Sequence, residues 1–196
     1  MLERIARIVK PLAPALICVA LVAAAPRGGP GTDVAIATSL GTIVVRLDAR
    51  AAPSTTKNFL HYVDTHAYDG SSFYRTVRRS SEPQARIEVI QGGLNPQSDN
   101  PMAAKLKLEP TSATHLHNTD GTIAMARTAD PNSATTEFFI DIGDDRFLDA
   151  GGPTGAGYAA FGKVIRGMEV VRKIQAAKAS GESLTPPVTI LKMRRV

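Results

Sequence analysis

The apolar residues of this chain occur in short runs separated by turn-forming residues, a pattern that predicts strands rather than long helices. The predicted strands cover residues 34–38, 42–47, 72–77, 87–91, 123–126, 138–140, 161–164 and 188–193. The first two flank Ser39-Leu40-Gly41, a turn that predicts a hairpin. Polar stretches that contain proline, at 78–86 and 95–114, are predicted to be loops.

Two segments show helical rather than alternating spacing of their apolar residues. Residues 52–65 carry one apolar stripe, and residues 167–177 carry a second. Pro53 suits the first turn of the first helix, where Ser54 and Thr55 are predicted to cap free backbone donors. Many short strands with only two helices predict an antiparallel sheet, most simply a closed barrel with helices over its ends.

The first 25 residues have the composition of a secretory signal peptide rather than of a folded segment. Arg4, Arg7 and Lys10 form a basic start. The apolar stretch 12–25 is shorter than the about 20 residues of a typical membrane span. We therefore predict that residues 1–25 are removed on export, with a retained membrane anchor as the alternative.

Removal of this segment would leave one domain at residues 33–196, preceded by a Gly- and Pro-containing linker at 26–32. The net charge would fall from +5 to +3, because residues 1–25 hold three basic side chains and one acidic one. No basic run is interleaved with aromatic residues, which argues against nucleic-acid binding. Cys18, the single cysteine, would be lost with the leader. We expect an exported, periplasmic monomer with no stable insertion in the membrane.

Several motifs together carry the functional signal. Residues 121–128 read GTIAMART, and Phe138-Phe139-Ile140 follows after a polar turn. The set is completed by Phe73-Tyr74-Arg75, by Ile90-Gln91-Gly92-Gly93 and by FGKV-x-x-GM-x-V at 161–170. In this order the motifs resemble the cyclophilin family of peptidyl-prolyl isomerases, and most of all its periplasmic bacterial branch. The resemblance runs from about residue 34 to the C-terminus. It implies an eight-stranded antiparallel barrel capped by two helices, isomerase activity on polypeptides that contain X-Pro bonds, and no cofactor or metal.

The resemblance implies catalytic roles for Arg75 and Gln91. An X-Pro bond rotates slowly because resonance gives it double-bond character, with a barrier of about 18–20 kcal/mol. A guanidinium near the prolyl nitrogen would weaken that resonance by electrostatic stabilisation, without exchanging a proton. Gln91 matches the glutamine that steadies the arginine and contacts the peptide backbone.

Further matches imply a surface that binds the substrate. Phe139 matches the aromatic floor beneath the proline ring, and strand alternation places Phe138 on the opposite face, in the core. Ala126 matches a backbone and methyl contact for the peptide. The other matched positions are Val89, Arg127, Phe147, Leu148 and Tyr158.

Two carboxylates depart from the family pattern. Glu88 stands where Phe is usual. A carboxylate there would remove apolar wall and could pair with Arg75, unless the long 78–86 segment turns it outward. Glu137 stands where Gln is usual. Both favour an alternative function, a cyclophilin-like module or chaperone that binds proline-containing peptides with weak or no catalysis.

Two further hypotheses rest on other residues. His115 and His117 would share a strand face and could hold a metal, but without a third ligand nearby we interpret them as solvated loop residues. A structural envelope protein would require that residues 12–25 stay uncleaved as an anchor.

Overall fold

The computed structural model describes residues 31–80, 85–94 and 104–196. The predicted signal peptide at 1–25 and the linker residues 26–30 lie outside the described residues. So do residues 81–84 and 95–103, which belong to the two predicted loops.

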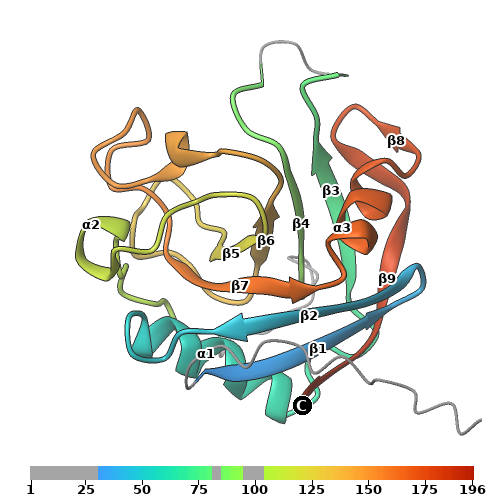
Figure 1. Ribbon diagram of the computed structural model, residues 1–196, viewed down its shortest axis with the longest axis horizontal. Helices are drawn as coiled ribbons and strands as arrows, with labels where there is room; N and C mark the ends of the chain where they lie inside the picture. Colours follow the sequence, from blue (N-terminus) through green and yellow to red (C-terminus); the bar gives the residue numbers. More distant parts are fainter. Residues whose placement is uncertain (1–30, 81–84, 95–103) are drawn as a thin grey trace, which may run out of the picture.

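Eight antiparallel strands close into a barrel (Figure 1), which confirms the predicted fold class. Their order around the barrel is β1-β2-β7-β5-β6-β4-β3-β9, and β9 pairs again with β1. Their bounds are Thr32–Thr38 for β1, Gly41–Leu47 for β2, Ser72–Val77 for β3, Val89–Gly93 for β4, Thr122–Met125 for β5, Phe138–Asp141 for β6, Ala160–Arg166 for β7 and Ser183–Arg195 for β9. The two-residue strand β8 (Ala179–Ser180) pairs only with the start of β9.

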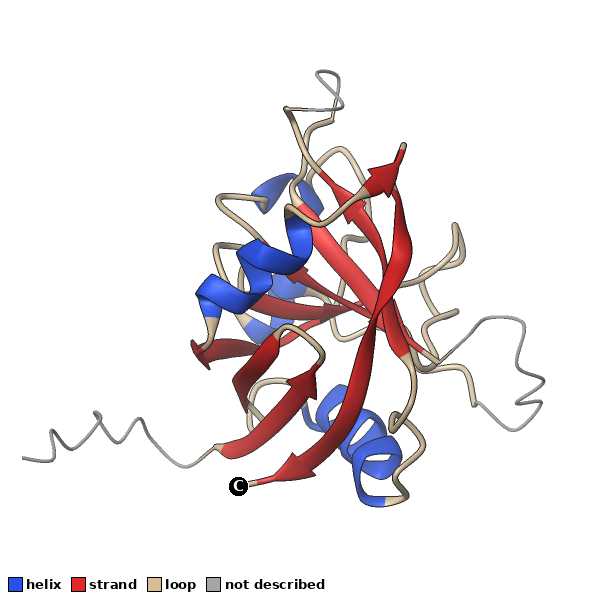
Figure 2. Ribbon diagram, turned by 90° about the vertical axis from the view of Figure 1, so that its right-hand side faces the viewer, coloured by secondary structure: helices blue, strands red, loops and turns tan. Residues whose placement is uncertain are grey.

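The two predicted helices are present as α1 (Pro53–Asp64) and α3 (Met168–Gln175), and they pack onto the barrel from separate sides (Figure 2). A one-turn helix, α2 (Thr111–Thr114), and a 3-10 turn, η1 (Arg146–Leu148), lie in segments that carry no helical pattern. No helix in the described part of the chain is long and apolar enough to cross a membrane.

An aromatic cluster fills the barrel beneath α1. The ring of Phe59 lies 5.3 Å from that of Tyr68, 5.5 Å from that of Phe138 and 5.3 Å from that of Phe161, measured between centroids. All four side chains are fully buried. Burial of each stabilises the fold by about 1.5–3 kcal/mol, and the tilted and edge-on ring contacts add to this.

The N-terminus of α1 is capped by a distant residue, not by its own Ser54 and Thr55 as the sequence suggested. The helix makes no side-chain cap from within its first turn. Instead, the Glu109 carboxylate accepts hydrogen bonds from Ser54 N at 3.0 Å, Thr55 N at 2.8 Å and Thr55 Oγ1 at 2.6 Å. A carboxylate satisfies the free donors and also stabilises the positive end of the helix dipole.

The alternation predicted for residues 188–193 is interrupted by a bulge. Thr38 of β1 pairs with Ile190, but the preceding Ala37 pairs with Lys192, so Leu191 is an extra residue. Ile190 and Met193 are therefore both fully buried, although strict alternation would place them on opposite faces.

Candidate active site

A bulge in β3 turns Arg75 to the outside of the barrel. Phe73 and Arg75 are two residues apart, so regular alternation would direct both side chains to the same face. Phe73 is fully buried in the core, and its backbone pairs with Gly92. Arg75 pairs with Gln91, the residue immediately before Gly92, so Tyr74 is the extra residue. The bulge re-aims Arg75, whose side chain is 36% exposed.

Arg75 and Gln91 are joined by a direct hydrogen bond. Arg75 Nη1 donates to Gln91 Oε1 at 2.8 Å. Arg75 Nε donates to the Glu182 carboxylate at 2.7 Å. Because a guanidinium carries five N–H donors, three remain for a bound peptide.

The amide of Gln91 is held from its other side as well. Its Nε2 donates to the Tyr74 hydroxyl oxygen at 2.8 Å and to Glu137 Oε2 at 3.1 Å. Burial, aided by the Glu137 carboxylate, raises the pKa of Tyr74 well above its usual value, so the hydroxyl stays neutral. The Glu137 carboxylate therefore binds the amide nitrogen of Gln91 and orients the amide so that Oε1 faces Arg75.

Gly93 allows the end of β4 to approach the segment that carries Glu137. Its φ of 140° lies in a region that favours glycine. A Cβ atom at this position would lie 2.8 Å from the Cα atom of Glu137, closer than non-bonded carbon atoms approach. The Gly92-Gly93 pair thus contributes to the site through its lack of side chains.

An apolar surface on the outside of the barrel adjoins this polar network. Phe139 pairs across strands with Gln91, whereas the neighbouring Phe138 is buried in the barrel core. This confirms that the two Phe residues divide between opposite faces of β6. We call the group around Phe139 the outer cluster; its buried members are Val77, Val89, Ala124, Phe139, Leu148 and Ala160, and Ala85, Ile87, Leu116, Ala126, Phe147 and Tyr158 pack against it half-buried.

Aromatic and arginine side chains form the rim of the outer cluster. The Tyr158 ring meets Phe139 edge-on at a centroid distance of 5.5 Å. The Arg127 guanidinium lies 4.5 Å from the centre of the Tyr158 ring and donates to the Gly157 carbonyl at 2.8 Å. Arg86 lies 5.7 Å from the centre of the Phe147 ring. Cation–π contacts near the protein surface contribute about 0.5–1 kcal/mol each.

Glu88 pairs with Arg79 and not with Arg75, so of the two placements that the sequence left open the structure does not show the pairing with Arg75. Its carboxylate lies 3.8 Å from Arg79 Nη1, and β4 begins only at the next residue. Ile87, one residue earlier, packs against the outer cluster instead. The half-buried Ile87 therefore supplies apolar wall on the side where Glu88 was expected to remove it.

The structure thus brings Arg75, Gln91 and Glu137 into one network beside the outer cluster. Every predicted substrate contact, namely Val89, Ala126, Arg127, Phe139, Phe147, Leu148 and Tyr158, lies in that cluster or on its rim. The sequence interpretation missed Tyr74, Ile87 and Glu182. Tyr74 lies in the Phe73-Tyr74-Arg75 motif, but the motif did not indicate its contact with Gln91, and Glu182 is 107 residues away from Arg75 in the chain.

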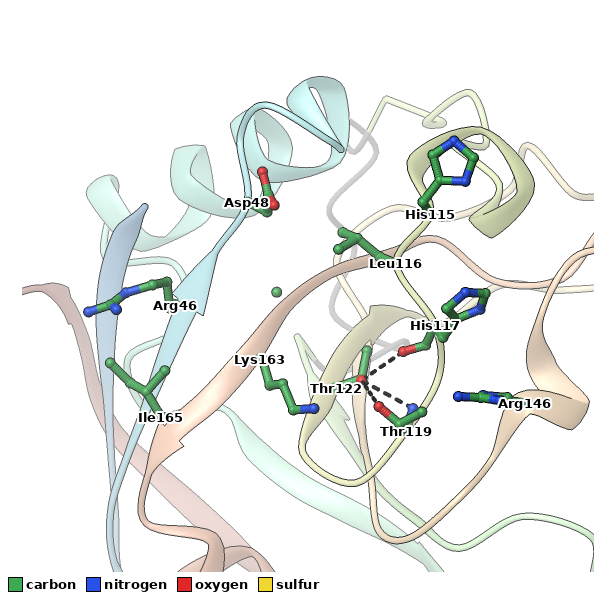
Figure 3. Close-up of a pocket in the computed structure, with 11 residues that line it drawn as sticks. Arg46, Asp48, His115, Leu116, His117, Thr119, Thr122, Arg146, Lys163 and Ile165 are labelled. Atoms are coloured by element: carbon green, nitrogen blue, oxygen red, sulfur yellow. Dashed lines mark hydrogen bonds between the residues drawn. The ribbon is translucent and has the colours of Figure 1, made fainter. Parts of the chain in front are cut away.

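A separate hollow of about 400 Å³ lies between β2, β7 and the segment around residues 115–122 (Figure 3). None of the predicted site residues lines it, although Leu116 both lines the hollow and packs against the outer cluster. Lys163 points from β7 toward Thr119 and toward Thr122, the first residue of β5. The hollow is therefore distinct from the predicted site.

His115 and His117 lie beside this hollow in a loop, not on the strand face that the sequence suggested. His117 Nδ1 lies 2.7 Å from the Asp149 carboxylate. Among the described residues there is no group of three or more His, Cys, Asp or Glu side chains that could hold a metal ion.

Comparisons with known proteins agree with this architecture. The model of the family described as "Cyclophilin type peptidyl-prolyl cis-trans isomerase/CLD" matches residues 33–195. A peptidyl-prolyl cis-trans isomerase of Acinetobacter baylyi is 42% identical over 143 residues, which cover 73% of this chain and 71% of the relative. Peptidyl-prolyl cis-trans isomerase B of Escherichia coli is 38% identical over 148 residues, 74% of this chain and 85% of the relative.

A solved structure shares the fold at lower identity. The crystal structure of a cyclophilin type peptidyl-prolyl cis-trans isomerase of Cryptosporidium parvum matches with a TM-score of 0.70 and 20% identity, and covers 85% of this chain and 98% of that chain. The present chain belongs to the cyclophilin-type peptidyl-prolyl cis-trans isomerase family. Its membership confirms the resemblance and the isomerase class that the motifs predicted.

Proposed function

We propose that this protein accelerates the isomerisation of X-Pro bonds in exported, folding polypeptides, with Arg75 as the catalytic group and Gln91 as its partner. The observation that carries the proposal is the Arg75–Gln91 hydrogen bond of 2.8 Å at the edge of the outer cluster. A charged donor beside an apolar surface suits a substrate in which a proline ring adjoins a resonance-stabilised amide.

The proposed mechanism needs binding and electrostatics alone. The proline ring rests on Phe139, with Val89 and Leu148 as buried neighbours. As the amide twists, its nitrogen becomes pyramidal and regains a lone pair, to which an Arg75 N–H donates. This interaction is stronger in the twisted state than in the planar one, so it lowers the barrier. Each tenfold increase in rate requires about 1.4 kcal/mol of such differential stabilisation.

A protease-coupled assay on an X-Pro peptide tests the role of Arg75. We expect Arg75→Ala to lower kcat/KM by about 100-fold, the usual effect of removing one preorganised donor. Arg172→Ala is the control, because this exposed arginine pairs with Asp120 away from the site. Rates for wild type and Arg75→Ala that both equal the uncatalysed rate would overturn the proposed activity.

The alternative function, a module that binds proline-containing segments with little catalysis, is favoured by Glu137, which stands where Gln is usual in the family. Glu137 Oε2 accepts a hydrogen bond from Gln91 Nε2 at 3.1 Å, so the amide already has an acidic partner before a peptide binds. An NMR titration with the same peptide separates the two functions. Binding by a wild-type protein that does not accelerate isomerisation would support the binding module.

The export of the protein is supported by the composition of residues 1–25, which lie outside the described residues. N-terminal sequencing of the protein from a periplasmic extract tests this directly. We expect a mature chain that begins near Ala25. An intact N-terminus in the membrane fraction would instead support the retained anchor and the structural envelope protein.

A further inference from the structure

We propose that Glu182 is a positioning residue for Arg75, holding its guanidinium in the orientation that the isomerase reaction requires. The inference rests on the proposed function, in which Arg75 is the catalytic group. Glu182 Oε2 accepts a hydrogen bond from Arg75 Nε at 2.7 Å, and Gln91 accepts one from Nη1 at 2.8 Å. Two contacts on different edges of a planar group fix both its location and its plane.

Glu182 is itself tied to the strand that carries Arg75. It lies in the two-residue turn between β8 and β9, where Gly181 has a φ of 56°. The Glu182 carbonyl accepts a hydrogen bond from Thr76 N at 2.8 Å, and Ser183 pairs with Arg75. The β8–β9 turn thus lies beside β3 (Figure 1), so the carboxylate is presented from an anchored backbone.

The ion pair is too exposed to be explained as a contribution to stability. The side chain of Arg75 is 36% exposed and that of Glu182 is 41% exposed. Pairs with this exposure typically contribute about 0–1 kcal/mol to folding. The reaction rate is far more sensitive to the orientation of Arg75, because a misplaced catalytic group can lower a rate by about 100-fold. Removal of the Glu182 carboxylate should therefore lower the catalytic rate with little change in the free energy of unfolding.

The contact also leaves the catalytic capacity of Arg75 intact. Glu182 uses the single Nε–H donor, and Gln91 uses one of the two N–H bonds on Nη1. One Nη1 donor and both Nη2 donors remain for the peptide. Glu182 thus binds the Nε edge of the guanidinium, next to the aliphatic part of the Arg75 side chain, and uses none of the terminal Nη donors.

Two variants test the inference on the full mature chain. We expect Glu182→Ala to lower kcat by about tenfold and to change the dissociation constant of an X-Pro peptide less than about twofold, because orientation and not binding is lost. Glu182→Gln should recover most of the rate, since its amide oxygen can still accept from Nε. Asp64→Ala is the matched control, because Asp64 forms an ion pair of similar exposure with Arg195, outside the active site.

An NMR measurement reports on Arg75 independently of activity. We expect the Nε–H signal of Arg75, assigned by its loss in Arg75→Lys, to exchange with water faster in Glu182→Ala than in wild type. Unchanged kcat and unchanged exchange in Glu182→Ala would overturn the inference. So would a faster enzyme, which would show that the carboxylate restrains Arg75 unproductively. If wild type itself fails to accelerate isomerisation, the proposed function fails instead.

Discussion

Asp141, at the end of β6, is buried without a hydrogen-bond partner for its carboxylate. Its side chain is fully shielded from solvent, and neither carboxylate oxygen has a hydrogen-bond partner. Burial raises the pKa of Asp141 well above its usual value, and the neighbouring Asp145 and Asp149 carboxylates raise it further. The folded protein therefore keeps a proton on Asp141 to higher pH than the unfolded chain does.

This raised pKa predicts a specific effect of Asp141→Asn on stability. Below about pH 4, Asp141 is protonated in both states, so no stability is lost. As the pH rises, the unfolded chain ionises first, and the free energy of unfolding decreases. Asp141→Asn removes this loss, so we expect its melting temperature relative to wild type to increase as the pH rises above about 4, where the unfolded chain ionises. Asp144→Asn, at a side chain that is 72% exposed, should show no such trend.

The pH dependence of the stability of Asp141→Asn also reports the contribution of Asp145. Burial raises the pKa of Asp145 to about 6, although its hydrogen bond from Glu88 N and the charge of Arg79 oppose the shift. In Asp141→Asn, the remaining loss of stability should therefore fall mainly between about pH 4 and pH 6. A flat profile for wild type over the whole range would contradict both assignments.

The site residues that could be predicted from the sequence are those that lie within motifs. Arg75, Gln91 and Phe139 each occur in a short, recognisable run, and they form one surface in the structure. Glu182 and Ile87 occur in no such run. Glu182 reaches Arg75 only because two distant strands are neighbours in the barrel, and no spacing in the sequence reveals that contact.

Bulges limit the prediction at the scale of the elements. Six of the eight predicted strands overlap closely with the structure, whereas β4 begins at Val89 and not at residue 87, and β9 begins at Ser183 and not at residue 188. Alternation gives the inward residues of a regular strand, but one extra residue exchanges the faces beyond it. The bulges at Tyr74 and Leu191 do this, and the first creates the exposed position of Arg75.

The long-range cap of α1 leads to a prediction at the same scale. Glu109→Ala removes the acceptor for two backbone N–H groups and the Thr55 hydroxyl, so we expect a loss of about 1–2 kcal/mol in the free energy of unfolding. Urea unfolding followed by circular dichroism measures it. The exposed Lys107→Ala is the control. Equal stability of the two variants would show that α1 does not depend on this cap.

At the scale of the whole molecule, β9 closes the barrel. It pairs with β3 on one side and with β1 on the other, so the last strand of the chain joins the first one. β3 is also the strand that carries Arg75. The integrity of the site therefore depends on residues at the far C-terminal end, although no residue of β9 belongs to the outer cluster.

Met193 and Leu191 test this closure as a matched pair within β9. Met193 is fully buried in the barrel core opposite Ile36, whereas Leu191, the bulged residue, is 57% exposed. We expect Met193→Ala to lower the free energy of unfolding by about 2–5 kcal/mol, because it leaves a cavity at the seam. Leu191→Ala should change it by about 0.5 kcal/mol or less. Urea unfolding monitored by circular dichroism is the suitable measurement, since the chain has no Trp. Equal losses for the two variants would contradict the register, because regular alternation without the bulge would place both side chains on the same face of β9.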